Sequence, residues 1–102
     1  MIYMKRIDFE WDNNKNLINR KKHGVDFSEA LTVFYDYQAI VIEDPEHSIS
    51  EERFTILGFS NTGNLLVVCY CYRRNDEVIR IISSRKASKT ESRQYYIMNG
   101  GS

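Results

Sequence analysis

Hydrophobic and acidic residues alternate over positions 7–12, near the start of the chain. This period-two pattern is typical of a β-strand with one buried face. Asp12 ends the pattern with a carboxylate that can accept hydrogen bonds from the first turn of a helix, which predicts a helix over 13–22. That helix is polar, and its apolar stripe consists of Leu17 and Ile18.

A second helix is predicted soon after Gly24, because glycine adopts the left-handed conformation that ends a helix at little cost. Asp26 and Glu29 have the spacing of a capping box at its start. The apolar residues that follow recur at the i, i+3, i+4 and i+7 positions of one buried helical face: Phe27, Ala30, Leu31 and Phe34.

The second half of the chain has the pattern of a β-meander. The expected elements are a short strand over 39–42, an acidic loop over 43–52, strands over 53–59, 65–72 and 78–84, and a helix from Ser88 to about Met98 that begins with a Ser88–Glu91 capping box. The run 65–72 is apolar on both faces, so we expect it at the centre of the sheet. In the last strand, alternation predicts one face with Ile79, Ile81 and Ser83 and another with Val78, Arg80 and Ile82.

The predicted element order is β-α-α-β-β-β-β-α. Connections of hairpin length imply a mainly antiparallel sheet, with two N-terminal helices and one C-terminal helix packed on it, which is an α+β fold. A length of 102 residues suits one compact domain. We expect that domain over 1–98, with 99–102 as a tail or a cloning remnant.

The charges form blocks along the chain. The 14 basic and 14 acidic residues cancel, which argues against a uniformly basic nucleic-acid-binding protein. The net charge is nevertheless uneven along the chain: it is +3 over 1–24, −3 over 25–42, −4 over 43–72 and +4 over 73–102. If the two basic blocks lie side by side on the sheet, they can form a surface that binds a phosphodiester. A merely solvated charged face is the competing interpretation.

Several classes of chemistry find no support in the sequence. No apolar run approaches the roughly 20 residues that cross a bilayer, and the N-terminus lacks the apolar segment of a signal peptide. Cys69 and Cys71 lie in an apolar strand, which favours core thiols over a nucleophile or a disulfide framework. With His23 and His47, they do not have the spacing of a metal site. The glycines match no phosphate-binding loop. We expect a cytoplasmic protein without metal or cofactor.

Two residues stand out as candidates for chemistry. Arg80 lies among apolar strand residues, and a rigidly held guanidinium suits phosphate binding and the stabilisation of transition-state charge. A salt bridge to Glu91 or Glu52 is its structural alternative. His23 could transfer protons near neutral pH, or it could simply complement the dipole at the end of its helix.

The C-terminal helix carries two neighbouring tyrosines, Tyr95 and Tyr96. Either could stack on a nucleic-acid base or anchor the helix to the sheet. Helical geometry predicts that one of the two is an anchor.

Taken in order, the motifs of this chain resemble those of the BrnT family over about residues 7–97. The motifs are Phe9-Glu10-Trp11-Asp12, Asn16-Leu17, Lys22-His23-Gly24-Val25, Phe27 to Phe34, Asp44-Pro45-Glu46-His47-Ser48, Glu52-Arg53-Phe54, and Arg80-Ile81-Ile82-Ser83-Ser84-Arg85 followed by Ala87, Glu91 and Tyr95. Ser84 departs from the family, which commonly has alanine there, and we expect no effect on the chemistry.

The resemblance implies a function that composition does not show. BrnT-like proteins are similar to RelE-type ribonucleases and are toxins of bacterial type II toxin–antitoxin systems. This implies RNA cleavage without a metal, inhibition of translation, and neutralisation by a BrnA-like antitoxin with a ribbon-helix-helix part. Operator DNA would be bound only through the antitoxin. No membrane partner is implied, and a homodimer is one option for the assembly.

RNA cleavage without a metal needs a base for the 2′-OH, a cation for the developing phosphorane charge and an acid for the 5′-oxygen. His23 is the candidate for proton transfer, ahead of Glu52 and Glu91. The candidates for phosphate and transition-state charge are Lys22, Arg53, Arg80 and Arg85. The candidates for RNA binding are Trp11, Lys21, Lys86, Lys89 and Tyr95, with Trp11 or Tyr95 stacking on a base.

The competing function is that of a BrnT-like module without catalytic activity, which only binds the antitoxin and co-represses its operon. The acidic loop 43–52 favours a basic protein partner in either case.

Overall fold

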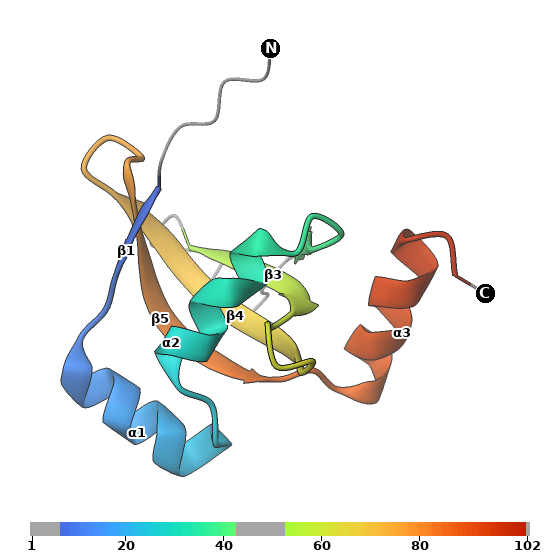
Figure 1. Cartoon of the computed structure of the whole chain (residues 1–102), viewed down its shortest axis with the longest axis horizontal. Helices are drawn as coiled ribbons and strands as arrows, with labels where there is room; N and C mark the ends of the chain where they lie inside the picture. Colours follow the sequence, from blue (N-terminus) through green and yellow to red (C-terminus); the bar gives the residue numbers. More distant parts are fainter. Residues whose placement is uncertain (1–6, 43–52, 102) are drawn as a thin grey trace.

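The computed structural model describes residues 7–42 and 53–101, so the acidic loop, with His47 and Glu52, lies outside the described residues. The elements are β1 (Asp8–Glu10), α1 (Asn13–His23), α2 (Phe27–Ala30), the 3-10 helix η1 (Leu31–Tyr35), β2 (Ile40–Ile42), β3 (Phe54–Phe59), β4 (Leu65–Arg73), β5 (Val78–Lys86) and α3 (Lys89–Met98). Figure 1 shows their arrangement around one sheet. The predicted α+β architecture and element order are confirmed.

The five strands have the spatial order β1-β5-β4-β3-β2. Neighbouring strands are antiparallel except at one edge, where β1 runs parallel to β5. β4 occupies the centre as predicted, and all of its residues from Leu66 to Tyr70 are buried. A strand that is apolar on both faces is therefore covered on both faces.

A β-bulge interrupts β5 at Ile82. Ser83 pairs with Cys69 and Ile81 pairs with Tyr70, so β5 has one more residue than β4 between these two pairs. Such an insertion bends the strand and shifts the alternation of the residues beyond it.

The faces expected for β5 were therefore wrong beyond the bulge. Ser84 pairs with the buried Val68 and is itself 1% exposed, whereas Ser83 is exposed. Ser83 consequently lies on the same face as Arg80 and Arg85. The bulge thus gathers three polar residues of one strand on one side of the sheet.

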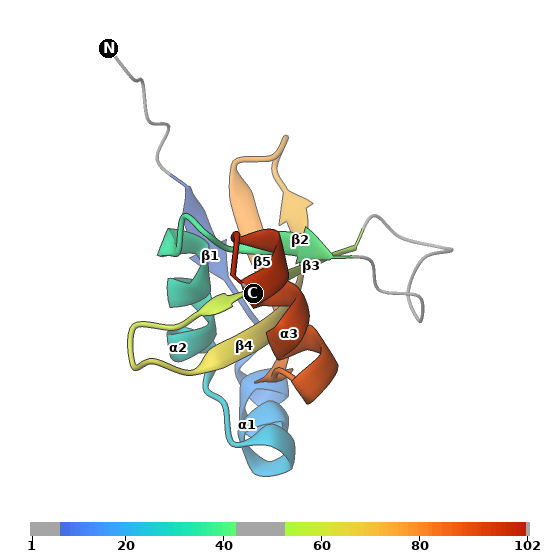
Figure 2. The same cartoon turned by 90° about the vertical axis from the view of Figure 1, so that its right-hand side faces the viewer.

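Different helices cover the two faces of the sheet, as Figure 2 shows. On one side, which we call the α2 face, α2 and η1 pack over the main core: Phe27, Ala30, Val33, Ile56, Leu66, Val68, Tyr70, Ile79 and Ile81. On the other side, the α3 face, α3 packs through Tyr95 against Leu57 and Val67. The remainder of the α3 face includes Arg80, Ser83 and Arg85.

The helix starts agree only in part with the predicted caps. Ser88 and Glu91 form the expected capping box at α3. Asp26 caps α2 by accepting from the Ser28 N–H, but Glu29 does not complete a second capping box. The Glu29 carboxylate instead accepts hydrogen bonds from the turn between β3 and β4, from Ser60, Thr62 and Asn64. Among residues 7–42 and 53–101, no helix has the length and apolar character needed to cross a membrane.

Candidate functional site

α1 lies against the part of the β5 edge that β1 does not pair with, and one buried amide side chain holds it there. The Asn19 Nδ2 atom donates to the Ser84 carbonyl at 2.9 Å, and the Ser84 N–H donates to Asn19 Oδ1 at 3.0 Å. The side chain therefore pairs with the edge of the strand as a neighbouring strand would. Leu17 and Ile18, expected as the apolar stripe, are 50% and 63% exposed, while Asn19 is 6% exposed.

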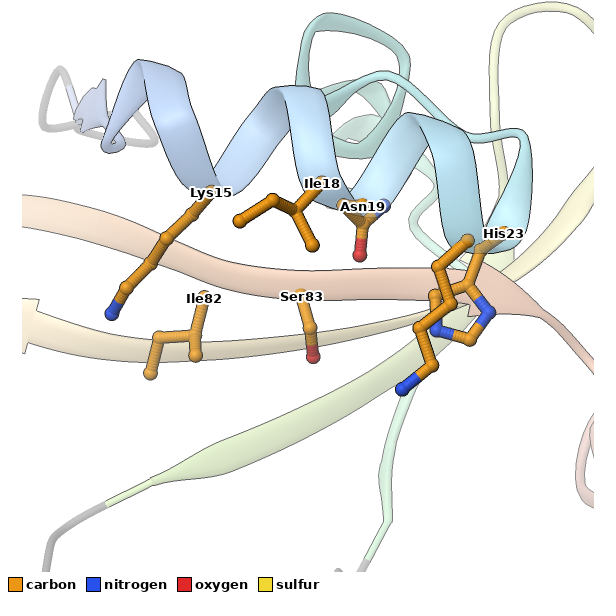
Figure 3. Close-up of a pocket in the computed structure, with 7 residues that line it drawn as sticks. Lys15, Ile18, Asn19, His23, Ile82 and Ser83 are labelled. Carbon is orange, nitrogen blue, oxygen red and sulfur yellow. The ribbon is translucent and has the colours of Figure 1, made fainter.

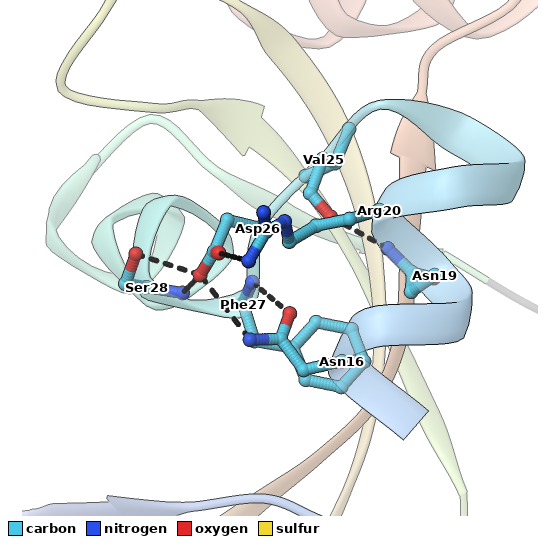
Figure 4. Close-up of polar contacts among 7 residues, drawn as sticks. All are labelled: Asn16, Asn19, Arg20, Val25, Asp26, Phe27 and Ser28. Atoms are coloured by element: carbon cyan, nitrogen blue, oxygen red, sulfur yellow. Dashed lines mark hydrogen bonds and ion pairs between the residues drawn. The ribbon is translucent and has the colours of Figure 1, made fainter. Parts of the chain in front are cut away.

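Polar contacts also fix the junction between α1 and α2, as Figure 4 shows. Asn19 Nδ2 donates to the Val25 carbonyl at 2.9 Å, and Asn16 Oδ1 accepts from the Phe27 N–H at 2.9 Å. Asp26 faces Arg20 at 3.4 Å. Hydrogen bonds from Ser28, chiefly its backbone N–H, lower the pKa of Asp26. These contacts hold α1 in one orientation relative to the sheet.

A shallow pocket of about 210 Å³ lies between α1 and β5 (Figure 3). The helix contributes residues at the i, i+3, i+4, i+7 and i+8 positions of a single face: Lys15, Ile18, Asn19, Lys22 and His23. The strand contributes Ile82 and Ser83, the two residues at the bulge. Two lysines and a half-buried histidine thus line a pocket that contains no acidic side chain.

Two arginines of β5 flank Ser83 on the α3 face, and each is paired with a carboxylate. Arg80 Nη1 lies 2.8 Å from Glu10 Oε2 of β1. This partner differs from the expected Glu91 or Glu52, because β1 runs beside β5 and places Glu10 level with Arg80. Arg85 donates hydrogen bonds to both carboxylate oxygens of Glu91 in α3, from Nη1 at 2.7 Å and from Nη2 at 2.8 Å.

Glu91 is not suited to the role of general base. The hydrogen bond from Arg85 lowers the pKa of Glu91 to about 2, with further help from the backbone N–H of Ser88. A carboxylate with so low a pKa binds a proton weakly at neutral pH. Glu91 serves the helix cap and orients Arg85.

Of the two aromatic residues expected to stack on RNA, Tyr95 is buried and Trp11 is half-buried against the core. Tyr95 is 4% exposed and donates to Asp36 Oδ2 at 2.7 Å, so it anchors α3 and cannot receive a base. Trp11 packs against the main core with its ring edge-on to Phe27, at a centroid distance of 6.2 Å. It therefore belongs to the α2 face.

The remaining predicted residues are spread over the surface. Lys86 pairs with Leu66 of the main core, so it lies on the α2 face, opposite Arg85. Lys21 and Lys89 are exposed and do not line the pocket. Arg53 directly precedes β3, and the alternation of that strand places it on the α3 face, level with Arg80. Two strand spacings of about 4.8 Å each separate it from β5.

Lys15, which belongs to the basic residues of the first helix, also lines the pocket, whereas Ile18, Ile82 and Ser83 were not expected there. The helical spacing of Lys15, Ile18 and Lys22 is a signal that could have identified one wall. The other wall depends on the bulge, which the pattern of a single strand does not show. Within residues 7–42 and 53–101, no group of three His, Cys, Asp or Glu side chains is placed to hold a metal ion.

A family model described as "Ribonuclease toxin, BrnT, of type II toxin-antitoxin system" matches residues 11–91. The chain belongs to the BrnT family. Its fold is similar to the crystal structure of the Brucella abortus ribonuclease toxin BrnT, with a TM-score of 0.63 and 24% identity over 82% of this chain and 100% of that one. No curated protein matches the sequence. Membership of the BrnT family places the chain among toxins that act with an antitoxin.

Proposed function

We propose that the chain is an endoribonuclease toxin that cleaves RNA without a metal ion and inhibits translation in the cytoplasm. A ribbon-helix-helix antitoxin neutralises it, and the complex binds operator DNA through the antitoxin. The BrnT family supports the ribonuclease and toxin classes. The antitoxin type rests on the resemblance to BrnT proteins alone, and the chemical route rests on the residues that line the pocket between α1 and β5.

The observation that carries the proposal is the pocket between α1 and β5. It combines a proton-transfer group, His23, with the ammonium group of Lys22, both on α1. Two arginines of β5 lie on either side of Ser83, which belongs to the opposite wall of the pocket. Ser83 and Arg85 are two residues apart, about 7 Å along a strand. A phosphodiester at this position can therefore reach Lys22 and Arg85 together. The lysine-rich lining repels divalent cations, which favours attack by the RNA's own 2′-OH.

In this route the 2′-oxygen bonds to phosphorus as the bond from phosphorus to the 5′-oxygen breaks. His23 either takes the 2′-OH proton or protonates the leaving 5′-oxygen, and solvent water makes the other proton transfer. Lys22, with Arg80, Arg85 and Arg53, stabilises the charge that develops on the phosphate oxygens. Arg80 and Arg85 already face a carboxylate each, so substrate binding exchanges Glu10 or Glu91 for a phosphate oxygen. The products are a 2′,3′-cyclic phosphate and a 5′-hydroxyl end.

The test is RNA cleavage by the purified chain in the presence of EDTA, combined with growth arrest on expression. We expect His23→Ala, Arg80→Ala and Arg85→Ala to lose at least about 100-fold in cleavage rate, the range for removing a general acid–base group or a charge-stabilising donor. Circular dichroism confirms the fold of each variant. Arg74→Asn, in the β4–β5 turn, removes the same charge away from the pocket and is expected to keep full activity. Full activity in all three site variants would exclude this site.

One observation favours the alternative, an inactive module that only binds antitoxin and co-represses its operon. Both arginines of β5 are neutralised by carboxylates, as in a surface that is purely structural. If the purified chain leaves RNA intact while its complex with the antitoxin binds operator DNA, the module is the correct function.

A further inference from the structure

The pocket between α1 and β5 has an apolar patch, Ile18 and Ile82, among basic residues. Figure 3 shows Lys15 and Ile82 together at one end of the pocket, Ile18 of the helix next to them, Asn19 and Ser83 in the middle, and His23 at the far end. Ile18 is 63% exposed, although a large aliphatic side chain gains by burial. An apolar contact surface is thus open to a ligand at a place where the lining is positively charged.

The dimensions suit one planar group and not a whole ligand. Pockets that enclose a drug-sized molecule measure about 300–1,000 Å³, whereas this one measures about 210 Å³. Lys15 and Lys22 are seven residues apart on the same helical face, which corresponds to about 10 Å along the axis. Ile18 lies between them on this face, so their ammonium groups can bind two phosphates on either side of a group that packs on Ile18.

We propose that this pocket binds one unstacked base of single-stranded RNA, with Lys15 and Lys22 binding the flanking phosphates. The inference rests on the proposed function, because it names the substrate class of the same site. A-form duplex RNA keeps its bases stacked and offers mainly its backbone to a protein, whereas a single strand can turn a base out of the stack. Single strands are also bound by a basic groove combined with aromatic side chains on which bases stack, and pockets for an unstacked base hold it between aromatic or apolar side chains.

The alternative occupant, an acidic peptide, is less well matched to the pocket. An extended peptide gains most of its affinity from backbone hydrogen bonds to a free strand edge. At Ser84 that edge is already bound by Asn19, which donates to the Ser84 carbonyl and accepts from its N–H. Because Asn19 occupies the strand edge next to the pocket, a peptide would find less backbone to pair with there than at a wholly free edge, which favours the flat face of a base.

The experiment measures binding separately from cleavage. The probe is a fluorescein-labelled 2′-O-methyl RNA, in which the blocked hydroxyl prevents attack on the phosphate, and binding is followed by fluorescence anisotropy. Three ligands are compared: the single strand, a duplex of the same sequence, and a single strand with an abasic backbone. Ile82→Ser and Ile18→Ser test the apolar patch, Leu17→Ser is the matched exposed apolar control on the same helix, and Arg74→Asn is the charge control.

We expect the intact single strand to bind at least about 10-fold more tightly than the duplex or the abasic strand, the range of one buried base. Ile82→Ser and Ile18→Ser remove that difference, while Leu17→Ser and Arg74→Asn keep it. Equal binding of the abasic strand, or an unchanged preference in both isoleucine variants, would overturn the inference. If an acidic peptide displaces the labelled RNA, and RNA binding does not depend on the presence of the bases, the pocket binds a protein partner instead. Base-dependent binding without cleavage of natural RNA would refute the proposed function alone.

Discussion

Asn19→Ala tests how the site is held together. Asn19 makes three hydrogen bonds to backbone atoms, two to Ser84 and one to Val25, and it is 6% exposed. Each bond contributes about 1 kcal/mol net, and buried partners left without a bond cost more. We therefore expect a loss of about 3–4 kcal/mol, a large share of the roughly 5–15 kcal/mol by which a domain of this size is stable.

Thermal and urea unfolding followed by circular dichroism measure this loss. For a domain near 100 residues, 1 kcal/mol corresponds to about 4–8 °C in Tm, so we expect Tm to fall by roughly 15 °C or more. Asn14→Ala is the matched control, because Asn14 is exposed on the same helix. It should change stability by less than about 0.5 kcal/mol.

Asn19→Asp adds a test by pH. At neutral pH the introduced carboxylate faces the carbonyls of Val25 and Ser84, so the variant should be at least as unstable as Asn19→Ala. Repulsion by these oxygens raises the pKa of the introduced group in the folded state, so protonation stabilises the fold and its benefit is lost as pH rises. The free energy of unfolding of Asn19→Asp should therefore lie closer to that of the parent protein at pH 4 than at pH 7. A loss below about 1 kcal/mol in Asn19→Ala would refute the claim that this amide fastens α1.

Three further variants test the packing of the fold. Ser84→Ala should stabilise the protein by about 1 kcal/mol in urea unfolding, because the buried Ser84 hydroxyl has no hydrogen-bond partner among the described residues; a loss of stability would mean that the hydroxyl has a partner. Gly58→Ala should cost about 1–3 kcal/mol, since an added Cβ would lie 2.8 Å from Ala39 Cβ and 2.9 Å from Val33 Cγ1, and unchanged stability would contradict that crowding. Burial alone would raise the pKa of Asp36, but hydrogen bonds from Phe59, Tyr95 and Gln38 outweigh it and lower the pKa. The ionised Asp36 therefore adds to the free energy of unfolding at pH values above its pKa in the unfolded state, and this contribution is lost as the pH falls through its pKa in the folded state. Asp36→Asn should therefore show a weaker decrease in the free energy of unfolding between pH 5 and pH 2. An identical acid dependence in both proteins would show that Asp36 is not involved.

The sequence was sufficient to predict the elements and their order, because local patterns determine them. Alternation marked β1, the double-sided apolar run marked β4 as central, and Ser88 with Glu91 marked the start of α3. These signals depend on neighbours within a few residues.

The contacts of the candidate site depend on the position of distant elements. Arg80 meets Glu10 only because β1 runs parallel to β5, and no local pattern specifies that pairing. Glu29 has the spacing of a capping box but binds the turn between β3 and β4, which competes for the same carboxylate. Tyr95 could not be distinguished from Tyr96 until the position of Asp36 was known.

The pocket is built from the two ends of the chain, and this sets when it can form during synthesis. α1 supplies one wall and β5 the other, with roughly 60 residues between His23 and Ile82. At elongation rates of about 5–20 residues per second, this interval lasts roughly 3–12 s. Until β5 has been translated, Asn19 has no strand edge to bind, and Lys22 and His23 have no opposing wall. The nascent chain therefore cannot carry the complete pocket until nearly all of it has been made.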